Sequence, residues 1–172
     1  MVELDPTMLI DIKYWHDMAK KPVNFAAEDY ILLFFLGGAT SICKDYCESL
    51  AGHFKLRIID LCDENHSLYD MVGPEEFLWL VKNAGIVATD SFHAVVFSIL
   101  FKRPFFVYSR QNASSMENRI DTLLRKFGLS DRKNLLNNYK RNLFDCDYSR
   151  IDDIFKSEIR KTQEFYNEIL ND

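Results

Sequence analysis

The sequence predicts an α/β fold, a three-layer Rossmann-like domain built on a mainly parallel sheet. The first observation is the run Tyr30–Leu36 (YILLFFL), which is continuously apolar, like a central parallel strand covered on both faces. The second is that Gly37-Gly38 and a helical pattern follow this run at once. The third is the same order further along, where an apolar strand at Ile86–Thr89, a helix and a strand at Pro104–Tyr108 succeed one another. Strands that alternate with helices indicate βαβ units and parallel pairing.

The overall composition indicates one globular domain and excludes several classes of protein. The 172 residues are 48% hydrophobic and 14% aromatic, which suffices for a core without disulfide staples. The net charge of −5, from 21 basic and 26 acidic residues, argues against a nucleic-acid binder. No apolar run approaches the roughly 20 residues of a membrane span, and the N-terminus has no signal-peptide pattern. We therefore expect no transmembrane segment and a cytoplasmic location.

Four cysteines are too few and too scattered for a disulfide framework. Cys43 and Cys47 lie one helical turn apart, with His53 nearby, so a metal site is an alternative at this point. Reduced thiols that pack in the core are the simpler interpretation. We therefore expect neither a metal nor a bound cofactor.

The first half of the chain has clear helix and strand signals. A short helix is expected at Ile12–Ala19, which ends before Pro22. After the first strand, a helix is expected from Thr40 to Ala51, closed by Gly52. The next strand is expected at Lys55–Asp60.

A polar loop with a little helical character is expected at Leu61–Val72, before a helix that begins at Gly73-Pro74 and ends near Asn83. Glu75 and Glu76 stand in the first turn of this helix, where acids complement the helix dipole. Capping is their ordinary interpretation. Glu76 is the better candidate for binding a ligand, because the start of a helix also faces the carboxyl edge of a parallel sheet.

The chain is organised around the junction that follows the strand Ile86–Thr89. Asp90 or Ser91 can cap the next helix, expected at about Phe92 to Lys102 and apolar nearly all round. His93 falls where the strand hands over to this helix. In open parallel sheets ligands bind at this edge, where helix N–H groups and the helix dipole favour an anion. A histidine beside such a position is a plausible proton donor.

The remaining elements supply basic residues and a closing helix. Arg110 lies in a polar loop at Ser109–Met116, and Arg119 lies in the first turn of a helix expected at Glu117–Phe127. A cation there opposes the dipole preference, which suggests that the guanidinium meets an anion. The last helix is expected at Ile151–Leu170, after a polar stretch at 130–148.

From the residues alone, Ser91, His93, Arg110 and Arg119 predict a pocket for a small phosphate or carboxylate. The alternative is that His93 is an ordinary surface or core residue. A serine nucleophile is disfavoured, because no G-x-S-x-G elbow exists. We divide the chain into an interdomain segment and linker at 1–29, a Rossmann-like donor-binding domain at 30–150, and a helix at 151–172 that packs on the same domain.

Three stretches resemble the C-terminal half of the polysaccharide pyruvyl transferase family: LDPTMLID, PEEFLWLVKNAGIVATDSFHAVVFSILFKRPFFVY and SMENRIDTLLRKFGL. The resemblance implies one half of a two-domain GT-B-like fold. It also implies transfer of a pyruvyl group from phosphoenolpyruvate to a sugar hydroxyl, giving a ketal. The family's S-F-H motif falls on Ser91, Phe92 and His93, which makes His93 the catalytic histidine. Its N-R-I motif falls on Asn118, Arg119 and Ile120.

The resemblance also implies partners for this chain. These are a missing N-terminal domain, the donor phosphoenolpyruvate and a sugar or lipid-linked glycan acceptor, in bacterial surface or capsular polysaccharide synthesis at the inner face of the membrane. Without the other half, we expect the 172 residues to be inactive. Two alternatives stay open, a GT-B-type glycosyltransferase half that uses a nucleotide sugar and a non-catalytic half-domain.

Overall fold

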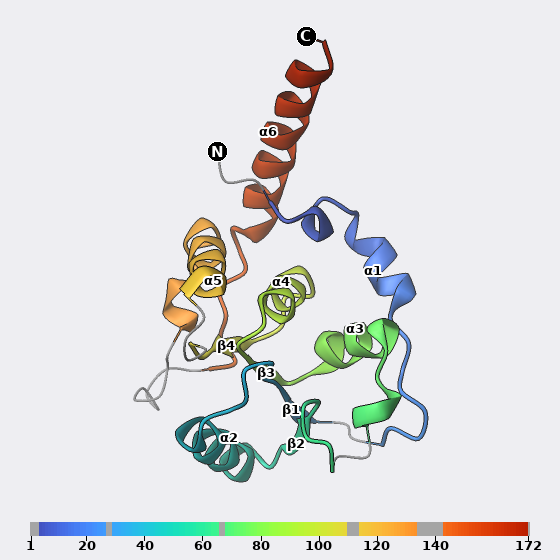
Figure 1. Ribbon diagram of the computed structural model, residues 1–172, viewed down its shortest axis with the longest axis vertical. Coiled ribbons are helices and arrows are strands. Elements are labelled where there is room, and N and C mark those ends of the chain that lie inside the picture. Colours follow the sequence, from blue (N-terminus) through green and yellow to red (C-terminus); the bar gives the residue numbers. More distant parts are fainter. Residues whose placement is uncertain (1–3, 27–28, 66–67, 110–113, 134–142, 172) are drawn as a thin grey trace.

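The fold is a three-layer α/β domain built on four parallel strands, as predicted (Figure 1). The computed structural model describes residues 4–26, 29–65, 68–109, 114–133 and 143–171. The strands lie in the order β2-β1-β3-β4. Their bounds are Tyr30–Phe34 for β1, Arg57–Asp60 for β2, Ile86–Thr89 for β3 and Phe105–Val107 for β4.

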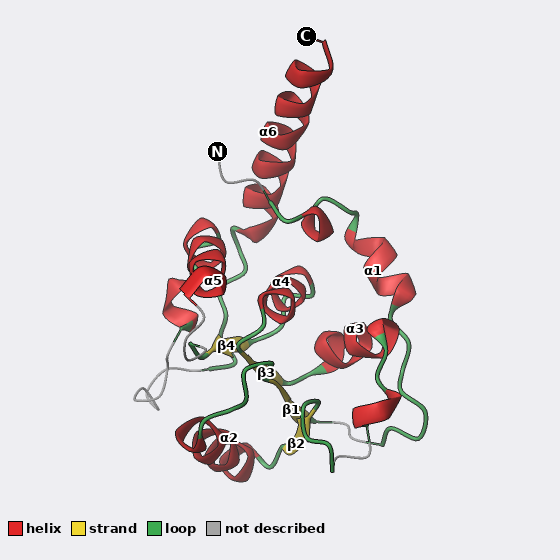
Figure 2. Cartoon of the chain, viewed as in Figure 1, coloured by secondary structure: helices red, strands yellow, loops and turns green. Residues whose placement is uncertain are grey.

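Helices cover both faces of this sheet (Figure 2). The α-helices are α1 (Ile12–Met18), α2 (Ser41–Phe54), α3 (Pro74–Asn83), α4 (Phe92–Leu100), α5 (Ser114–Lys126) and α6 (Ile151–Asn171). Short 3₁₀ turns are η1 (Pro6–Met8), η2 (Tyr69–Met71) and η3 (Ser130–Arg132). Helix α2 lies on one side of the sheet, while α1, α3, α4 and α5 lie on the other (Figure 1). The turn η2 is the helical character expected in the loop after β2.

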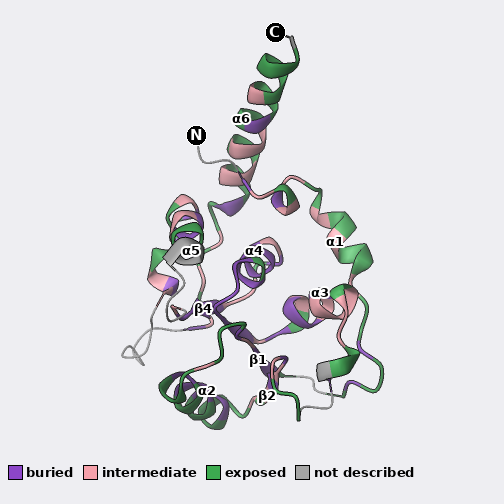
Figure 3. Ribbon diagram, in the orientation of Figure 1, coloured by how far each residue is buried: buried purple, intermediate pink, exposed green. Residues whose placement is uncertain are grey.

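The alternation of side chains along the strands builds two cores. In β1, Tyr30 and Leu32 belong to the core under α3 and α4, whereas Ile31 and Leu33 belong to the core under α2. All four side chains are at most 4% exposed. A strand buried on both sides explains why the sequence of β1 is apolar without interruption, and Figure 3 shows the strands as buried between exposed outer helix faces.

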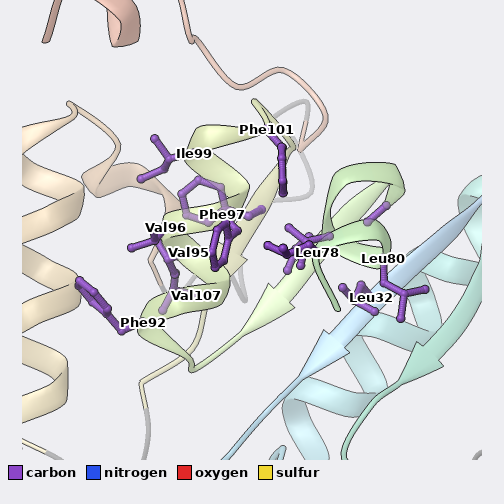
Figure 4. Packing of buried hydrophobic residues seen from close by; sticks show 14 of the residues in the cluster. Leu32, Leu78, Leu80, Phe92, Val95, Val96, Phe97, Ile99, Phe101 and Val107 are labelled. Carbon is purple, nitrogen blue, oxygen red and sulfur yellow. The ribbon is translucent and has the colours of Figure 1, made fainter. Parts of the chain in front are cut away.

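Helix α4 is the most buried helix of the domain and supports the site at its N-terminus. Val95, Val96 and Ile99 have no exposed surface. Full burial of such a side chain contributes about 1.5–3 kcal/mol. Phe92 points toward α5, and Phe97 points toward α3 (Figure 4). With neighbours on both sides and the sheet beneath, α4 holds its first turn firmly in place.

Three boundaries in the first half differ from prediction. Helix α2 does not close at Gly52 but continues to Phe54. Lys55 then takes the left-handed conformation, with φ 57°, and the helix ends through a hydrogen bond from Leu56 N–H to Ala51 C=O at 2.9 Å. Lys55 takes the left-handed position that glycine usually occupies at the end of a helix. The prediction that α2 closes at Gly52 was therefore wrong. Strand β1 ends at Phe34, two residues earlier than expected, and β2 begins at Arg57, two residues later than expected.

The start of α5 differs as well, and this corrects one argument. The helix begins at Ser114 rather than Glu117, so Arg119 lies in its second turn. The dipole argument for Arg119 as an anion ligand was therefore wrong. Its role has to be judged from its contacts.

The C-terminal helix α6 packs on the domain through its first half and projects beyond the body through its second (Figure 1). Ile151 is buried, and Ile154, Phe155 and Ile159 pack against the same core as α4. Among the described residues, no helix has both the length and the apolar character needed to cross a membrane.

Candidate active site

The carboxyl ends of β1 and β3 meet at the centre of the sheet, where the strand order reverses direction. The register aligns Phe34 of β1 with Thr89 of β3. The Thr89 hydroxyl donates a hydrogen bond to the Phe34 carbonyl at 2.6 Å, which ties the two strand ends together. This is the position at which open α/β sheets bind their ligands.

A carboxylate of the chain itself fills part of this position. Asp90 is 3% exposed, and its two oxygens accept hydrogen bonds at 2.8 Å from the N–H groups of Leu36 and Gly37. The glycine loop after β1 therefore lies close to the turn after β3. These two N–H groups are not free for a phosphate.

The cap at the start of α4 also differs from prediction, because Asp90 binds the loop after β1 instead. Ser91 occupies the N-cap position, but its side chain makes no capping hydrogen bond, and Asp90 is engaged with the loop after β1. Ser91 is buried, and its N–H donates to the Thr89 hydroxyl at 2.9 Å. The first turn of α4 therefore has no side-chain cap among the residues that the structure describes.

His93 is the exposed residue on this otherwise buried helix. Its side chain is 55% exposed, while Phe92 before it and Ala94 after it are buried. Its Nε2 atom lies 4.0 Å from Oδ1 of Asp5, in the segment before α1. The imidazole is thus open to solvent and has the Asp5 carboxylate as a neighbour.

Arg119 reaches the same carboxylate from α5. Its Nη2 atom donates to Oδ2 of Asp5 at 3.3 Å, and its guanidinium lies 4.1 Å from the centre of the Phe92 ring. The side chain is 51% exposed. The structure therefore brings the predicted His93 and Arg119 together, although they lie on different helices.

Asp5 is the residue of this group that sequence reasoning missed. The sequence around Asp5 indicates only the start of a turn before Pro6. The Oδ1 atom of Asp5 also accepts from the N–H of Thr7 at 3.1 Å and from the Thr7 hydroxyl at 2.7 Å. An aspartate that caps a proline-led turn is visible in the sequence, but its contact with a helix more than a hundred residues away is not.

A cavity of about 340 Å³ adjoins this group. It is lined by Leu4, Asp5, Phe92, Asn118, Arg119, Thr122, Leu123 and Lys126. Asn118 and Arg119 of the N-R-I motif both face it. A larger hollow of about 770 Å³ lies at the C-terminal end of α5, but it is lined by neither His93 nor Arg119. The smaller cavity is therefore the candidate ligand site, because Asp5 and Arg119 line it and Asp5 is the neighbour of His93.

Glu76, another predicted site residue, stands apart from this cavity. Glu76 closes the start of α3, where its Oε2 accepts from Gly73 N–H at 3.0 Å, which is its capping interpretation. None of its described contacts joins it to His93 or Arg119. Arg110 lies outside the described residues.

The cysteines behave as packing residues. Cys43 and Cys47 are at most 1% exposed in the core under α2. A hydrogen bond with Cys43, together with burial, raises the pKa of the Cys47 thiol. Within the described ranges, no group of three or more His, Cys, Asp or Glu side chains is placed to hold a metal ion.

Comparison with known families agrees with this arrangement. Residues 2–112 match the family described as polysaccharide pyruvyl transferase, and this range includes Asp5, Phe92 and His93. This chain belongs to the polysaccharide pyruvyl transferase family. The match covers well over half of the chain and ends before α5, so Arg119 lies beyond it. No curated protein and no solved structure matches the chain.

Proposed function

We propose that this chain is the C-terminal, donor-binding half of an enzyme that transfers a pyruvyl group from phosphoenolpyruvate to a sugar. The observation that carries the proposal is the exposed His93 imidazole at the carboxyl edge of the sheet, inside the family match and beside Arg119. The buried surroundings of α4 fix the start of this helix beside a cavity lined by Phe92 and Arg119. The position suits a general acid next to an anionic substrate.

In the proposed reaction, His93 donates its proton to the methylene carbon of phosphoenolpyruvate. A sugar hydroxyl attacks C2 at the same time, so the double bond is consumed and the methylene becomes a methyl group. A second hydroxyl of the same sugar then displaces phosphate from C2. The products are a cyclic ketal and inorganic phosphate, and the protons of the two hydroxyls balance the one given by His93 and the one leaving with phosphate.

The donor carries a phosphate and a carboxylate, and both need positive partners. Arg119 supplies a guanidinium that can bind either group through two hydrogen bonds. The uncapped first turn of α4 supplies N–H groups and the positive end of a helix dipole. Ser91, which belongs to the S-F-H motif, and Arg110, which follows β4 in the sequence, complete the proposed donor site.

The acceptor would enter from the other side of this rim. We propose a sugar or lipid-linked glycan as acceptor, held mainly by an N-terminal domain that packs against this half. The place of action would be the cytoplasmic face of the membrane, in synthesis of a surface or capsular polysaccharide. These proposals rest on the family alone.

The test is His93→Ala in the full-length protein, with phosphate release from phosphoenolpyruvate as the measurement. Loss of a general acid is expected to lower kcat at least about 100-fold. His53→Ala is the matched control, because His53 is an exposed histidine at the end of α2 and belongs to a different edge of the domain. Near-normal turnover by His93→Ala would refute the assignment.

A glycosyltransferase that uses a nucleotide sugar is the competing proposal. In nucleotide-binding Rossmann domains the N–H groups of the first glycine turn hold the diphosphate. Here Asp90 occupies the N–H groups of Leu36 and Gly37, which counts against that donor. Incubation with each donor separates the two proposals, since one releases phosphate and the other a nucleotide. If neither phosphate nor a nucleotide is released, a non-catalytic half-domain is favoured.

A further inference from the structure

We infer that Asp5 is a positioning residue that holds His93 and Arg119 at one site. The inference rests on the proposed function for its catalytic consequence, but the contact itself can be tested without substrate. Asp5 lies outside the sheet, in the segment before α1, and still faces both cationic groups. The comparisons assign it no role.

The two oxygens of Asp5 face different partners. Oδ1 is 4.0 Å from Nε2 of His93, and Oδ2 accepts from Nη2 of Arg119 at 3.3 Å. The first distance is that of an ion pair rather than of a hydrogen bond, so the attraction exists only while the ring is protonated. The protonated ring is the form that a proton donor needs at the start of the reaction. Asp5 therefore faces both His93 and Arg119 and orients the two side chains with one carboxylate.

Asp5 is itself held rigidly. The N–H and hydroxyl of Thr7 both donate to Oδ1, and the side chain is only 11% exposed. A carboxylate removed this far from water needs positive partners, and Arg119 and His93 are those that the structure provides. The Phe92 ring supports the guanidinium from below, at 4.1 Å. The arginine is thus fixed between a ring and a carboxylate before any ligand binds.

The test is Asp5→Asn in the full-length protein. The amide oxygen of asparagine can still accept from Thr7, so the turn keeps its cap while the negative charge is lost. Asp11→Asn is the matched control. Asp11 caps α1 in the same way, accepting from Lys13 N–H at 2.8 Å, and it is exposed. The two variants make the same chemical change in the same segment, but only one removes a carboxylate from the site.

For the Asp5→Asn variant, kcat is expected to fall about 10- to 100-fold, the range in which a misplaced catalytic group reduces rate. The KM for phosphoenolpyruvate is expected to stay level or to fall, because Arg119 is no longer neutralised by a carboxylate. Asp11→Asn is expected to leave both constants unchanged. A purely structural role would instead lower the melting temperature and leave kcat per folded molecule unchanged, which would overturn the inference.

A substrate-free measurement separates this inference from the proposed function. The Cε1–Hε1 resonance of His93, assigned by its loss in His93→Ala, is expected to move in Asp5→Asn and not in Asp11→Asn. An unmoved resonance means that the contact is absent and overturns the inference. If the wild-type protein releases no phosphate from phosphoenolpyruvate while the resonance moves, the proposed function fails and the contact stands.

A second variant guards against misfolding of Asp5→Asn. Thr7→Val removes the hydroxyl that fixes Oδ1 and keeps the Asp5 charge. A smaller fall in kcat is expected, and Thr7→Ser, which restores the hydroxyl, is expected to recover it. Equal rates in Thr7→Val and Thr7→Ser would contradict the role of Asp5 as a fixed positioning group.

Discussion

The loop after β1 and the turn after β3 lie side by side at the same edge of the sheet, yet they have opposite uses. Each presents backbone N–H groups ahead of a helix. The loop after β1 is closed by the Asp90 carboxylate, which accepts from both Leu36 and Gly37. The start of α4 has no side-chain cap and presents an exposed histidine. The glycine pair is therefore closed by a carboxylate, and the candidate site lies instead beside the start of α4.

The largest expected effect is that of Asp90→Ala, which removes the carboxylate that closes the loop after β1. Two backbone N–H groups would lose the charged and buried carboxylate that accepts from them, so the free energy of unfolding is expected to fall by about 3 kcal/mol. Urea denaturation at neutral pH measures this change. Asp11→Ala removes an exposed cap and is expected to cost only about 1 kcal/mol. Equal losses in the two variants would mean that Asp90 is not a structural bridge.

Beside the start of α4, Arg119→Lys tests whether the shape of the Arg119 side chain, as well as its charge, matters for binding the donor. Lysine keeps the charge but loses the planar fork and the contact with the Phe92 ring. We expect the KM for phosphoenolpyruvate to rise about 10-fold, since a bidentate partner becomes a point charge. Steady-state kinetics of the full-length protein measure this KM. Arg125→Lys, the same exchange at an exposed residue of α5 that does not line this cavity, is the control. An unchanged KM in Arg119→Lys would place the donor elsewhere.

The smallest expected effects are those of Gly38→Ala and Gly52→Ala, which should change the stability of the fold in opposite directions. Gly38 has a φ of +80° in the loop after β1, so Gly38→Ala is expected to destabilise the fold by about 1 kcal/mol, although no atom obstructs the added methyl group. Gly52 lies inside α2, also with open space around it, and Gly52→Ala is expected to stabilise the fold by about 0.5–1 kcal/mol. Thermal unfolding of both variants gives the sign. The same sign in both would refute the conformational argument.

Local signals in the sequence predicted most of the fold. The bounds of β3 at Ile86–Thr89 agree with prediction, because a glycine before it and an aspartate after it delimit a short apolar run. Helix α3 was predicted for a similar reason, with Pro74 at its start and Asn83 at its end. The end of α2 and the start of α5 were missed, because Lys55 adopts a glycine-like conformation and serines begin a helix.

The candidate site was predicted only in part. His93 follows from a local pattern, since a strand, a turn and an apolar helix fix its place along the chain. Asp5 and the bridge made by Asp90 depend on contacts between segments far apart in sequence. Such pairings are decided by tertiary packing, and a single sequence carries no direct signal for them.

The segment that carries Asp5 is attached to the domain by side chains alone. Residues 4–18 all lie outside the sheet. Their anchors are Met8, which is 1% exposed, and Trp15, which packs on Phe97 and donates from its indole N–H to the Thr7 carbonyl at 3.0 Å. Regions held in this way open at a lower free energy than a central sheet does. In amide hydrogen exchange, the backbone around Asp5 should therefore lose protection well before β1 and β3. Each such opening separates Asp5 from His93 and Arg119 while the rest of the molecule stays folded.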